Sequence, residues 1–218
     1  MRGERGMTLI EATIVLTMVS ILAAASAPSV SRTLAQARLS RAKTDVEAIK
    51  TAIDTFLTTF TVFTAKFTST GATGGDTIEV LVSDGDTPLL SSTISGLGGN
   101  NLYWDDAVTC CGTEPDVSFL ENHLVLNSSL GGAGSYSTAA TGWKGAYINA
   151  PIDSDPWGNR YAVNTAYLAA STANDVIVMS AGPDEEIDTQ YVWTTGGAYP
   201  GDDDIITVIR RDSALGVP

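Results

Sequence analysis

The chain has 218 residues, enough for one domain of ordinary size with an additional element and too few for a large multidomain enzyme. Its formal net charge of −13 is unevenly distributed, because residues 71–218 carry four basic side chains against twenty acidic ones. Such an acidic domain is repelled by phosphate backbones, which argues against nucleic acid as its main ligand and favours cations. The single histidine, His123, excludes a metal site built from several histidines.

The N-terminal sequence combines a short basic leader with an apolar segment. Arg2 and Arg5 lie in the leader, and the 19 residues 12–30 are uncharged. As a helix these residues extend about 28 Å, which is close to the thickness of one hydrocarbon core. Basic residues on the short side predict a cytoplasmic N-terminus and an extracytoplasmic C-terminal domain. The expected location is therefore a single-pass protein of the inner (cytoplasmic) membrane, with its C-terminal domain on the periplasmic side.

Glu11 is the one ionisable side chain among residues 7–30. An isolated carboxylate at mid-membrane costs about 2.5–3.5 kcal/mol on insertion scales, so Glu11 needs a partner. The junction suited to cleavage, between Gly6 and Met7, precedes the apolar segment, whereas a secretory signal has its junction after it. The alternative is a plain signal anchor in which Glu11 lies near the membrane interface.

The stretch MTLIEATIVL after Gly6 resembles the N-terminus of type IV pilins and type II secretion pseudopilins. The resemblance implies cleavage after Gly6 by a prepilin peptidase and N-methylation of the new first residue, Met7, which stands where the family usually has Phe. It also implies that Glu11 pairs with the free amine of Met7 on a neighbouring subunit. A charge that is costly in isolation would then align subunits during filament assembly.

Beyond the membrane segment, apolar residues recur in steps of three or four, without Gly or Pro from Ser29 to Thr70. This pattern predicts one continuous helix from about Thr8 to about Phe63, bent or loosened near Pro28, which lacks a backbone donor. The expected divisions are a leader (1–6), a membrane and filament-core helix (7–30), an amphipathic spine (31–67) and a globular domain (68–218). The phenylalanines of the spine indicate that it packs on the globular domain. The alternative is a solvated linker helix.

The middle of the chain carries weaker signals. A helix is expected over about Val117–Leu130, with Ser118 and Glu121 in capping-box spacing and His123 on its surface. Asp84 and Asp86 match only a fragment of a calcium loop, so a solvated turn is expected there. The motifs GxSxG and HExxH are absent, and the chain is therefore not expected to be an enzyme.

A tight turn is predicted after residue 154. Asp155, Pro156 and Gly158 occupy positions that these residue types prefer in a type I turn. Strands are expected at Arg160–Asn164, Asp175–Ser180 and Ile205–Arg210. The predicted structural turn consists of Asp155, Pro156, Trp157, Gly158 and Asn159.

This region resembles the major pseudopilins of type II secretion, in which a W-x-G-x-Y segment leads into Asp-Pro-Trp-Gly-Asn and a strand. Here the first segment is Trp143, Gly145 and Tyr147, and Arg160 replaces the family's frequent Pro. The resemblance implies an α+β, type IV pilin-like "lollipop" fold. In that fold the long N-terminal helix packs on a small antiparallel sheet of three or four strands.

Residues 181–205 form an acidic loop between the last two predicted strands. Like charges at this density repel one another unless a cation neutralises them, and Ca²⁺ takes six to eight oxygen ligands in flexible geometry. The alternative is a solvated acidic loop. The carboxylates are Asp184, Glu185, Glu186, Asp188, Asp202, Asp203 and Asp204.

Major pseudopilins hold calcium at the equivalent loop, as S-x-G-x-D followed by a closing D-x-D-I. The resemblance therefore implies Ca²⁺ as the cofactor, with Asp184 as the first ligand. Asp202 and Asp204 would form the closing pair, with Asp203 as a potential substitute. The loop between them is longer here than is usual in the family.

These observations predict a structural subunit of a type II secretion pseudopilus that polymerises through its N-terminal helix to drive protein export. The implied partners are other copies of the chain, the prepilin peptidase and methyltransferase, the inner-membrane assembly platform with its ATPase, and minor pseudopilins. One alternative is a type IV pilin for adhesion, motility or DNA uptake. Another is a signal-anchored, calcium-dependent extracytoplasmic binding domain.

Overall fold

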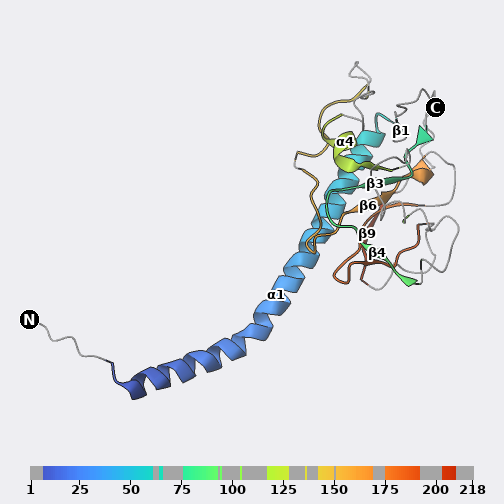
Figure 1. Ribbon diagram of the computed structural model, residues 1–218. Coiled ribbons are helices and arrows are strands. Elements are labelled where there is room, and N and C mark those ends of the chain that lie inside the picture. Colours follow the sequence, from blue (N-terminus) through green and yellow to red (C-terminus); the bar gives the residue numbers. More distant parts are fainter. Residues whose placement is uncertain are drawn as a thin grey trace, which may run out of the picture. The chain divides into compact units, whose positions relative to one another are not determined.

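The protein has an α+β fold, with one long N-terminal helix followed by a mixed sheet of five strands (Figure 1). The chain divides into two compact units, Met1–Ser40 and Arg41–Pro218. The predicted fold class is confirmed. The computed structural model describes residues 7–60, 64–65, 76–92, 94, 104, 117–127, 136, 142–149, 151–168, 175–191 and 203–209.

The first helix, α1, spans Leu9–Leu57 and contains Pro28. It ends about six residues before the predicted end at Phe63. After Leu57 the amides of Thr59 and Phe60 both bond to the carbonyl of Phe56, which closes the last turn tightly. The cause is the Thr58–Thr59 pair, because β-branched side chains lose rotamer freedom in a helix.

The apolar part of α1 satisfies its own polar groups. The hydroxyls of Thr13, Thr17 and Ser20 donate to carbonyls of the preceding turn, each at 2.8 Å. Ser26 and Ser29 do the same at 3.1 and 2.8 Å. Such internal bonding is what an apolar surrounding requires, since lipid offers no partners to a hydroxyl.

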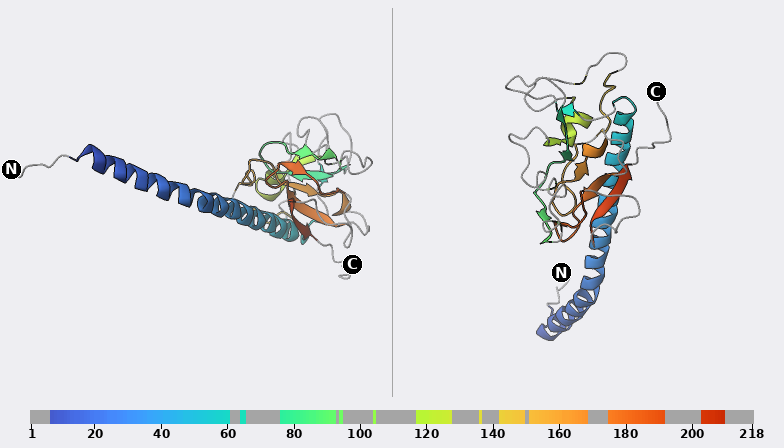
Figure 2. Two further views of the ribbon diagram at one scale, coloured as in Figure 1. Left: turned by 90° about the horizontal axis from the view of Figure 1, so that it is seen from below. Right: turned by 90° about the vertical axis from the view of Figure 1, so that its right-hand side faces the viewer.

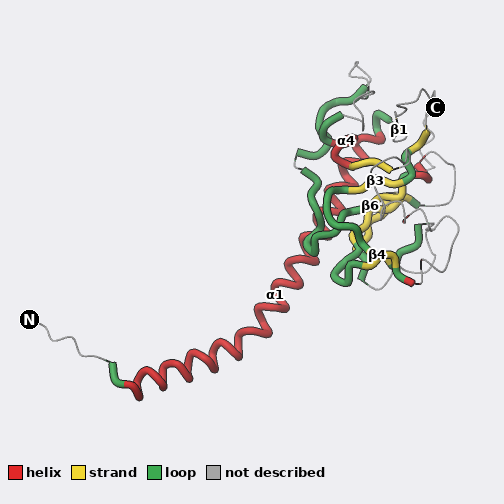
Figure 3. Tube along the Cα trace, viewed as in Figure 1, coloured by secondary structure: helices red, strands yellow, loops and turns green. Residues whose placement is uncertain are grey.

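The five-stranded sheet has the strand order β5-β3-β6-β7-β9, and its neighbouring strands β3 and β6 are labelled in Figures 1 and 3. All neighbours are antiparallel except β3 and β5, which are parallel. The expected small antiparallel sheet of three or four strands is therefore wrong in size and in one pairing, because the middle of the chain adds β3 and β5. The strands are β3 (Val80–Val82), β5 (Val117–Phe119), β6 (Ala162–Asn164), β7 (Val176–Ser180) and β9 (Ile205–Ile209).

Four short strands form two further pairs. β1 (Thr64–Ala65) pairs antiparallel with β2 (Asp76–Thr77). β4 (Leu89–Leu90) pairs parallel with β8 (Glu186–Ile187), which brings the middle of the chain against the acidic loop.

The C-terminal part of α1 packs on one face of the five-stranded sheet (Figure 2). Its buried residues follow the spacing of three and four that the sequence shows, so one helical stripe faces the sheet. Full burial of each larger aliphatic or aromatic side chain contributes about 1.5–3 kcal/mol. The buried residues of the stripe are Ala42, Val46, Ile49, Ala52, Ile53 and Phe56.

Two polar contacts accompany this packing. The hydroxyl of Tyr161 donates to Oδ2 of Asp45 at 2.9 Å, and the hydroxyl of Thr207 donates to Oε1 of Glu47. Burial and the neighbouring Asp45 raise the pKa of Tyr161, so its hydroxyl stays protonated as the donor. These bonds fix the helix relative to β6 and β9.

The predicted helix at 117–130 is mostly wrong, because its start is strand β5 and, among the described residues 117–127, only α4 (Leu120–Leu124) is helical. The expected capping box does not form, since Ser118 instead contacts His123. His123 is buried and not on the surface, with Nδ1 2.7 Å from the Tyr136 hydroxyl and Nε2 2.8 Å from the Ser118 hydroxyl. Two neutral partners so placed stabilise an uncharged imidazole.

The burial of His123 predicts a pH-dependent stability. Burial lowers the pKa of His123 from 6.5 to about 4 in the folded chain. The unfolded chain therefore binds the extra proton first, and stability that is complete above about pH 6.5 falls as the pH drops toward 4. Between pH 7 and 4.5 we expect this group to remove about 2–3 kcal/mol from the free energy of unfolding.

Chemical denaturation of the full chain in detergent at both pH values measures this loss. The control is His123→Gln. Between the same two pH values, its free energy of unfolding should fall by about 2–3 kcal/mol less than that of the wild type. An equal loss in wild type and His123→Gln would contradict the assignment to His123.

Candidate functional site

The predicted turn at residues 155–159 is organised by one buried carboxylate. Oδ1 of Asp155 accepts the backbone amides of Trp157 and Asn159, both at 2.9 Å. Oδ2 accepts the hydroxyl of Ser180 at 2.6 Å. Gly158 has a φ of +105°, a value that L side chains rarely adopt, so a glycine is required at this position. Three donors thus hold the Asp155 carboxylate, which is only 3% exposed.

The Asp84–Asp86 segment docks on this turn from the middle of the chain. The amide of Asp86 donates to the carbonyl of Gly158 at 2.8 Å, and the amide of Arg160 donates to the carbonyl of Asp86 at 3.0 Å. Both aspartates are exposed. Although burial lowers the pKa of Arg160, these two carboxylates oppose that shift. The solvated turn expected at Asp84 and Asp86 is therefore present, and the positive charge near it is the guanidinium of Arg160.

Ser180 links the turn to the acidic loop. Its hydroxyl oxygen donates to Asp155 and accepts the amide of Gly182 at 3.2 Å. Gly182 has a φ of +74°, and a Cβ there would lie 2.5 Å from the carbonyl oxygen of Asp203. Only glycine therefore allows the two ends of the loop to approach so closely.

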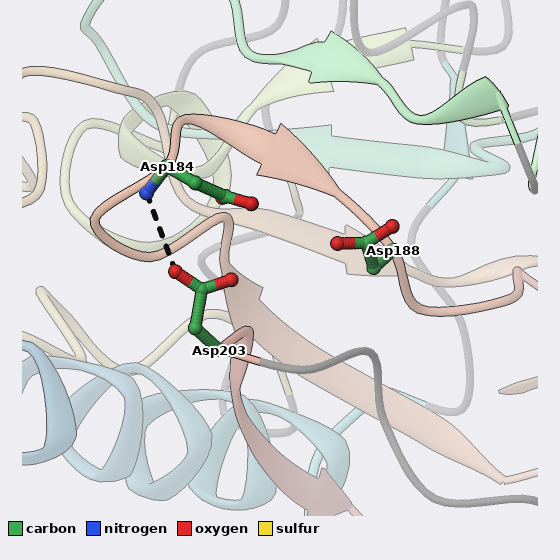
Figure 4. A group of neighbouring side chains, drawn as sticks. All are labelled: Asp184, Asp188 and Asp203. Carbon is green, nitrogen blue, oxygen red and sulfur yellow. Dashed lines mark hydrogen bonds between the residues drawn. The ribbon is translucent and has the colours of Figure 1, made fainter.

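Three carboxylates of the loop converge. Asp184, Asp188 and Asp203 each offer one oxygen, and these oxygens lie within 4.8 Å of one another (Figure 4). The amide of Asp184 donates to Oδ2 of Asp203 at 3.3 Å. Burial and the neighbouring Asp184 raise the pKa of Asp203. A cation here would oppose that shift, because it favours the charged carboxylates.

Asp204, the expected closing ligand, is held by backbone amides of the loop. Its Oδ2 accepts the amides of Asp188 at 3.0 Å and Thr189 at 2.6 Å. Burial raises the pKa of Asp204 to about 7, against the opposing effect of these hydrogen bonds. Asp204 is not part of the group of three, and Asp202 lies outside the described residues. Asp203, the potential substitute, lies beside Asp184.

Two buried carboxylate oxygens in this region have no hydrogen-bond partner among the described residues. They are Oδ1 of Asp203 and Oδ1 of Asp204. A carboxylate oxygen removed from water needs a donor or a cation to offset its desolvation. The donor set therefore fits a hard cation such as Ca²⁺.

The N-terminal residues lie at the start of α1. Thr8 caps the helix, because its carbonyl accepts the amide of Ala12 at 3.1 Å and its Oγ1 the amide of Glu11 at 3.4 Å. Glu11 is exposed in the first turn. Met7 is also exposed, and Gly6 lies outside the described residues. In the described part of the chain, α1 is the one helix long and apolar enough to cross a membrane.

Residues 131–192 match the family model of type II secretion system (T2SS) protein G. Protein G is the major pseudopilin, so the predicted resemblance is confirmed over these residues. The matched part includes the turn at residues 155–159 and the first half of the acidic loop. At the level of the family, the match supports a pseudopilin role in type II secretion. No curated protein and no solved structure gave a significant match.

The family of the match is a structural component of a secretion system and not a family of enzymes. The apolar helix that could span a membrane is consistent with an anchored pseudopilin.

Asp188 was not singled out as a ligand from the sequence. Its only signal was membership of the acidic loop, and the family pattern names Asp184 and the closing aspartates. Asp188 lies close to Asp184 because only three residues separate them and the backbone turns at Glu185, which has a φ of +66°.

Removal of the Asp155 carboxylate should lower the free energy of unfolding substantially. In Asp155→Ala the amides of Trp157 and Asn159 and the hydroxyl of Ser180 all lose their acceptor in a buried place. We expect the free energy of unfolding to fall by at least about 3 kcal/mol, measured by chemical denaturation of the full chain in detergent. The exposed Asp153 provides the control, since Asp153→Ala should change it by no more than about 0.5 kcal/mol. Similar values for the two variants would contradict the role of the turn.

Proposed function

We propose that the chain is a structural subunit of a type II secretion pseudopilus, which polymerises through its N-terminal helix to drive protein export. The observation that carries this proposal is the family match at residues 131–192 in a chain that also has a membrane-length apolar helix with Glu11 in its first turn. The match to a secretion family favours export over the alternative of a type IV pilin. Work would come from an assembly ATPase on an inner-membrane platform, and the chain itself would carry out no catalysis.

Maturation would prepare the N-terminus for assembly. A prepilin peptidase would cut after Gly6 and methylate Met7, leaving the domain that contains the acidic loop on the periplasmic side. The new amine of Met7 would pair with Glu11 of a neighbouring subunit. The exposure of Glu11 supports this, because its carboxylate is available to another chain. Minor pseudopilins would join the same filament.

We also propose that the acidic loop binds Ca²⁺. Asp184, Asp188 and Asp203 would hold the ion, with Asp202 and Asp204 as further candidates. The support is the convergence of the three carboxylates and the buried Oδ1 of Asp203, which has no hydrogen-bond partner among the described residues. Bound calcium would neutralise the repulsion between these carboxylates and join the two ends of the loop. The chain's own contribution is to bring Asp203 beside Asp184 through the close approach at Gly182.

The assembly role of Glu11 predicts a specific defect. Glu11→Gln removes the charge that would pair with the Met7 amine, so filament content should fall to less than about a tenth of wild type. Processing should continue, because the substitution leaves Gly6 and Met7 intact. Co-expression with the secretion machinery, followed by sedimentation of sheared filaments and N-terminal sequencing, measures both.

Glu4→Gln is the matched control, since the leader is removed before assembly and filaments should be normal. A signal-anchored binding domain instead predicts that Glu11→Gln behaves as wild type. That result, with Met7 as the new N-terminus, would contradict the assembly role.

The calcium site predicts a ligand-dependent stability. At calcium concentrations about a hundredfold above the dissociation constant, binding should stabilise the folded chain by about 2.7 kcal/mol. Thermal melting of the full chain in detergent, with calcium and with chelator, measures this as a rise in Tm. Asp184→Asn should abolish the rise. Glu185→Gln, which alters the exposed neighbour outside the group of three, should retain it. If the wild-type Tm is the same with calcium and with chelator, the proposed site is wrong.

A further inference from the structure

A segment that precedes the family match in the sequence contacts the acidic loop and holds its backbone in place. The match begins at residue 131, whereas β4 and Trp104 both lie earlier in the chain. β4 pairs in parallel with β8, in the first half of the loop. Trp104 is fully buried and packs edge to face on Tyr191, with ring centroids 5.0 Å apart.

These contacts fall next to two of the converging carboxylates. The amide of Leu89 donates to the carbonyl of Glu185 at 2.9 Å, directly after Asp184. The indole Nε1 of Trp104 donates to the carbonyl of Thr189 at 3.0 Å, directly after Asp188. The backbone at each of these two aspartates is thus tied to the middle of the chain.

The conformation at Glu185 shows why such ties are needed. Glu185 has a φ of +66°, in the left-handed region that residues other than glycine rarely adopt. Such a backbone persists only when its surroundings hold it in place. The bond from Leu89 to the Glu185 carbonyl does so, and it keeps the loop in the shape that brings Asp184 toward Asp188.

We propose that Trp104 and strand β4 position Asp184 and Asp188 for the cation, which makes Trp104 a positioning residue of the calcium site. This inference rests on the proposed calcium binding of the acidic loop. Carboxylates that repel one another would otherwise have to be ordered by the ion itself, at a cost to affinity. Holding the adjacent carbonyls removes part of that cost before the ion arrives.

The test is Trp104→Phe, which removes the indole donor and retains an aromatic ring against Tyr191. Isothermal titration of the full chain in detergent with calcium chloride should give a dissociation constant about fivefold weaker, the factor expected for one net hydrogen bond. Trp143→Phe is the matched control. It also removes a bond from an indole to a carbonyl, from Trp143 to His123 at 3.4 Å, and should bind calcium as wild type does.

Leu89→Pro is the second variant. It removes the amide that donates to Glu185 and sacrifices little packing, because Leu89 is 62% exposed. Its calcium affinity should weaken similarly. Melting in chelator provides the additional readout, since a purely structural role of Trp104 would lower Tm in chelator without changing the dissociation constant.

The outcomes separate the two proposals. Calcium binding by wild type with unchanged affinity in both Trp104→Phe and Leu89→Pro would overturn the positioning role and leave the calcium site standing. A wild-type chain that binds no calcium would overturn both. Weaker binding in both variants, with Trp143→Phe unchanged, is the expected result.

Discussion

The buried carboxylate of Asp155 is the interaction on which the arrangement of the C-terminal region depends. It closes the turn through two amides and reaches the end of β7 through Ser180. Because Ser180 also accepts the amide of Gly182, the same carboxylate fixes where the acidic loop begins. The turn and the loop look like separate motifs in the sequence, yet one hydrogen-bonded chain of groups joins them. A buried charge is stable here because three donors surround it.

Other carboxylates of the chain meet the same physical requirement in different ways. Asp204 receives two amides on one oxygen, while its other oxygen and one oxygen of Asp203 have no partner among the described residues. Glu11 stands exposed next to the uncharged segment 12–30 of α1. Internal donors therefore satisfy Asp155, whereas the proposed function would supply a cation to the acidic loop and a neighbour's amine to Glu11. This contrast unites the two halves of the proposed function.

Much of the fold was predictable from local pattern, and the contacts around the site were not. Strands β7 and β9 lie within one residue of their predicted bounds, because unbroken β-branched runs flanked by turn residues define them. The burial of His123 and the parallel pairing of β3 with β5 depend on partners outside the local sequence. Trp104 is the clearest case, since Thr189 lies 85 residues further along the chain. Periodicity predicts which face of an element is buried, but it does not predict which part of the chain packs on that face.

The middle of the chain is part of the folded core and not an appendage to a pseudopilin-like region. The match at residues 131–192 covers β6 and β7, whereas the strands on either side of this pair, β3 and β9, lie outside it. β3 supplies Leu81 to the core shared with α1 and also pairs with β5, so this segment widens the sheet that the helix covers. The same segment continues into β4, which holds the acidic loop. A stretch that carries the weakest sequence signals thus connects the helix, the sheet and the candidate metal site, because its role is set by packing and backbone pairing instead of by motif.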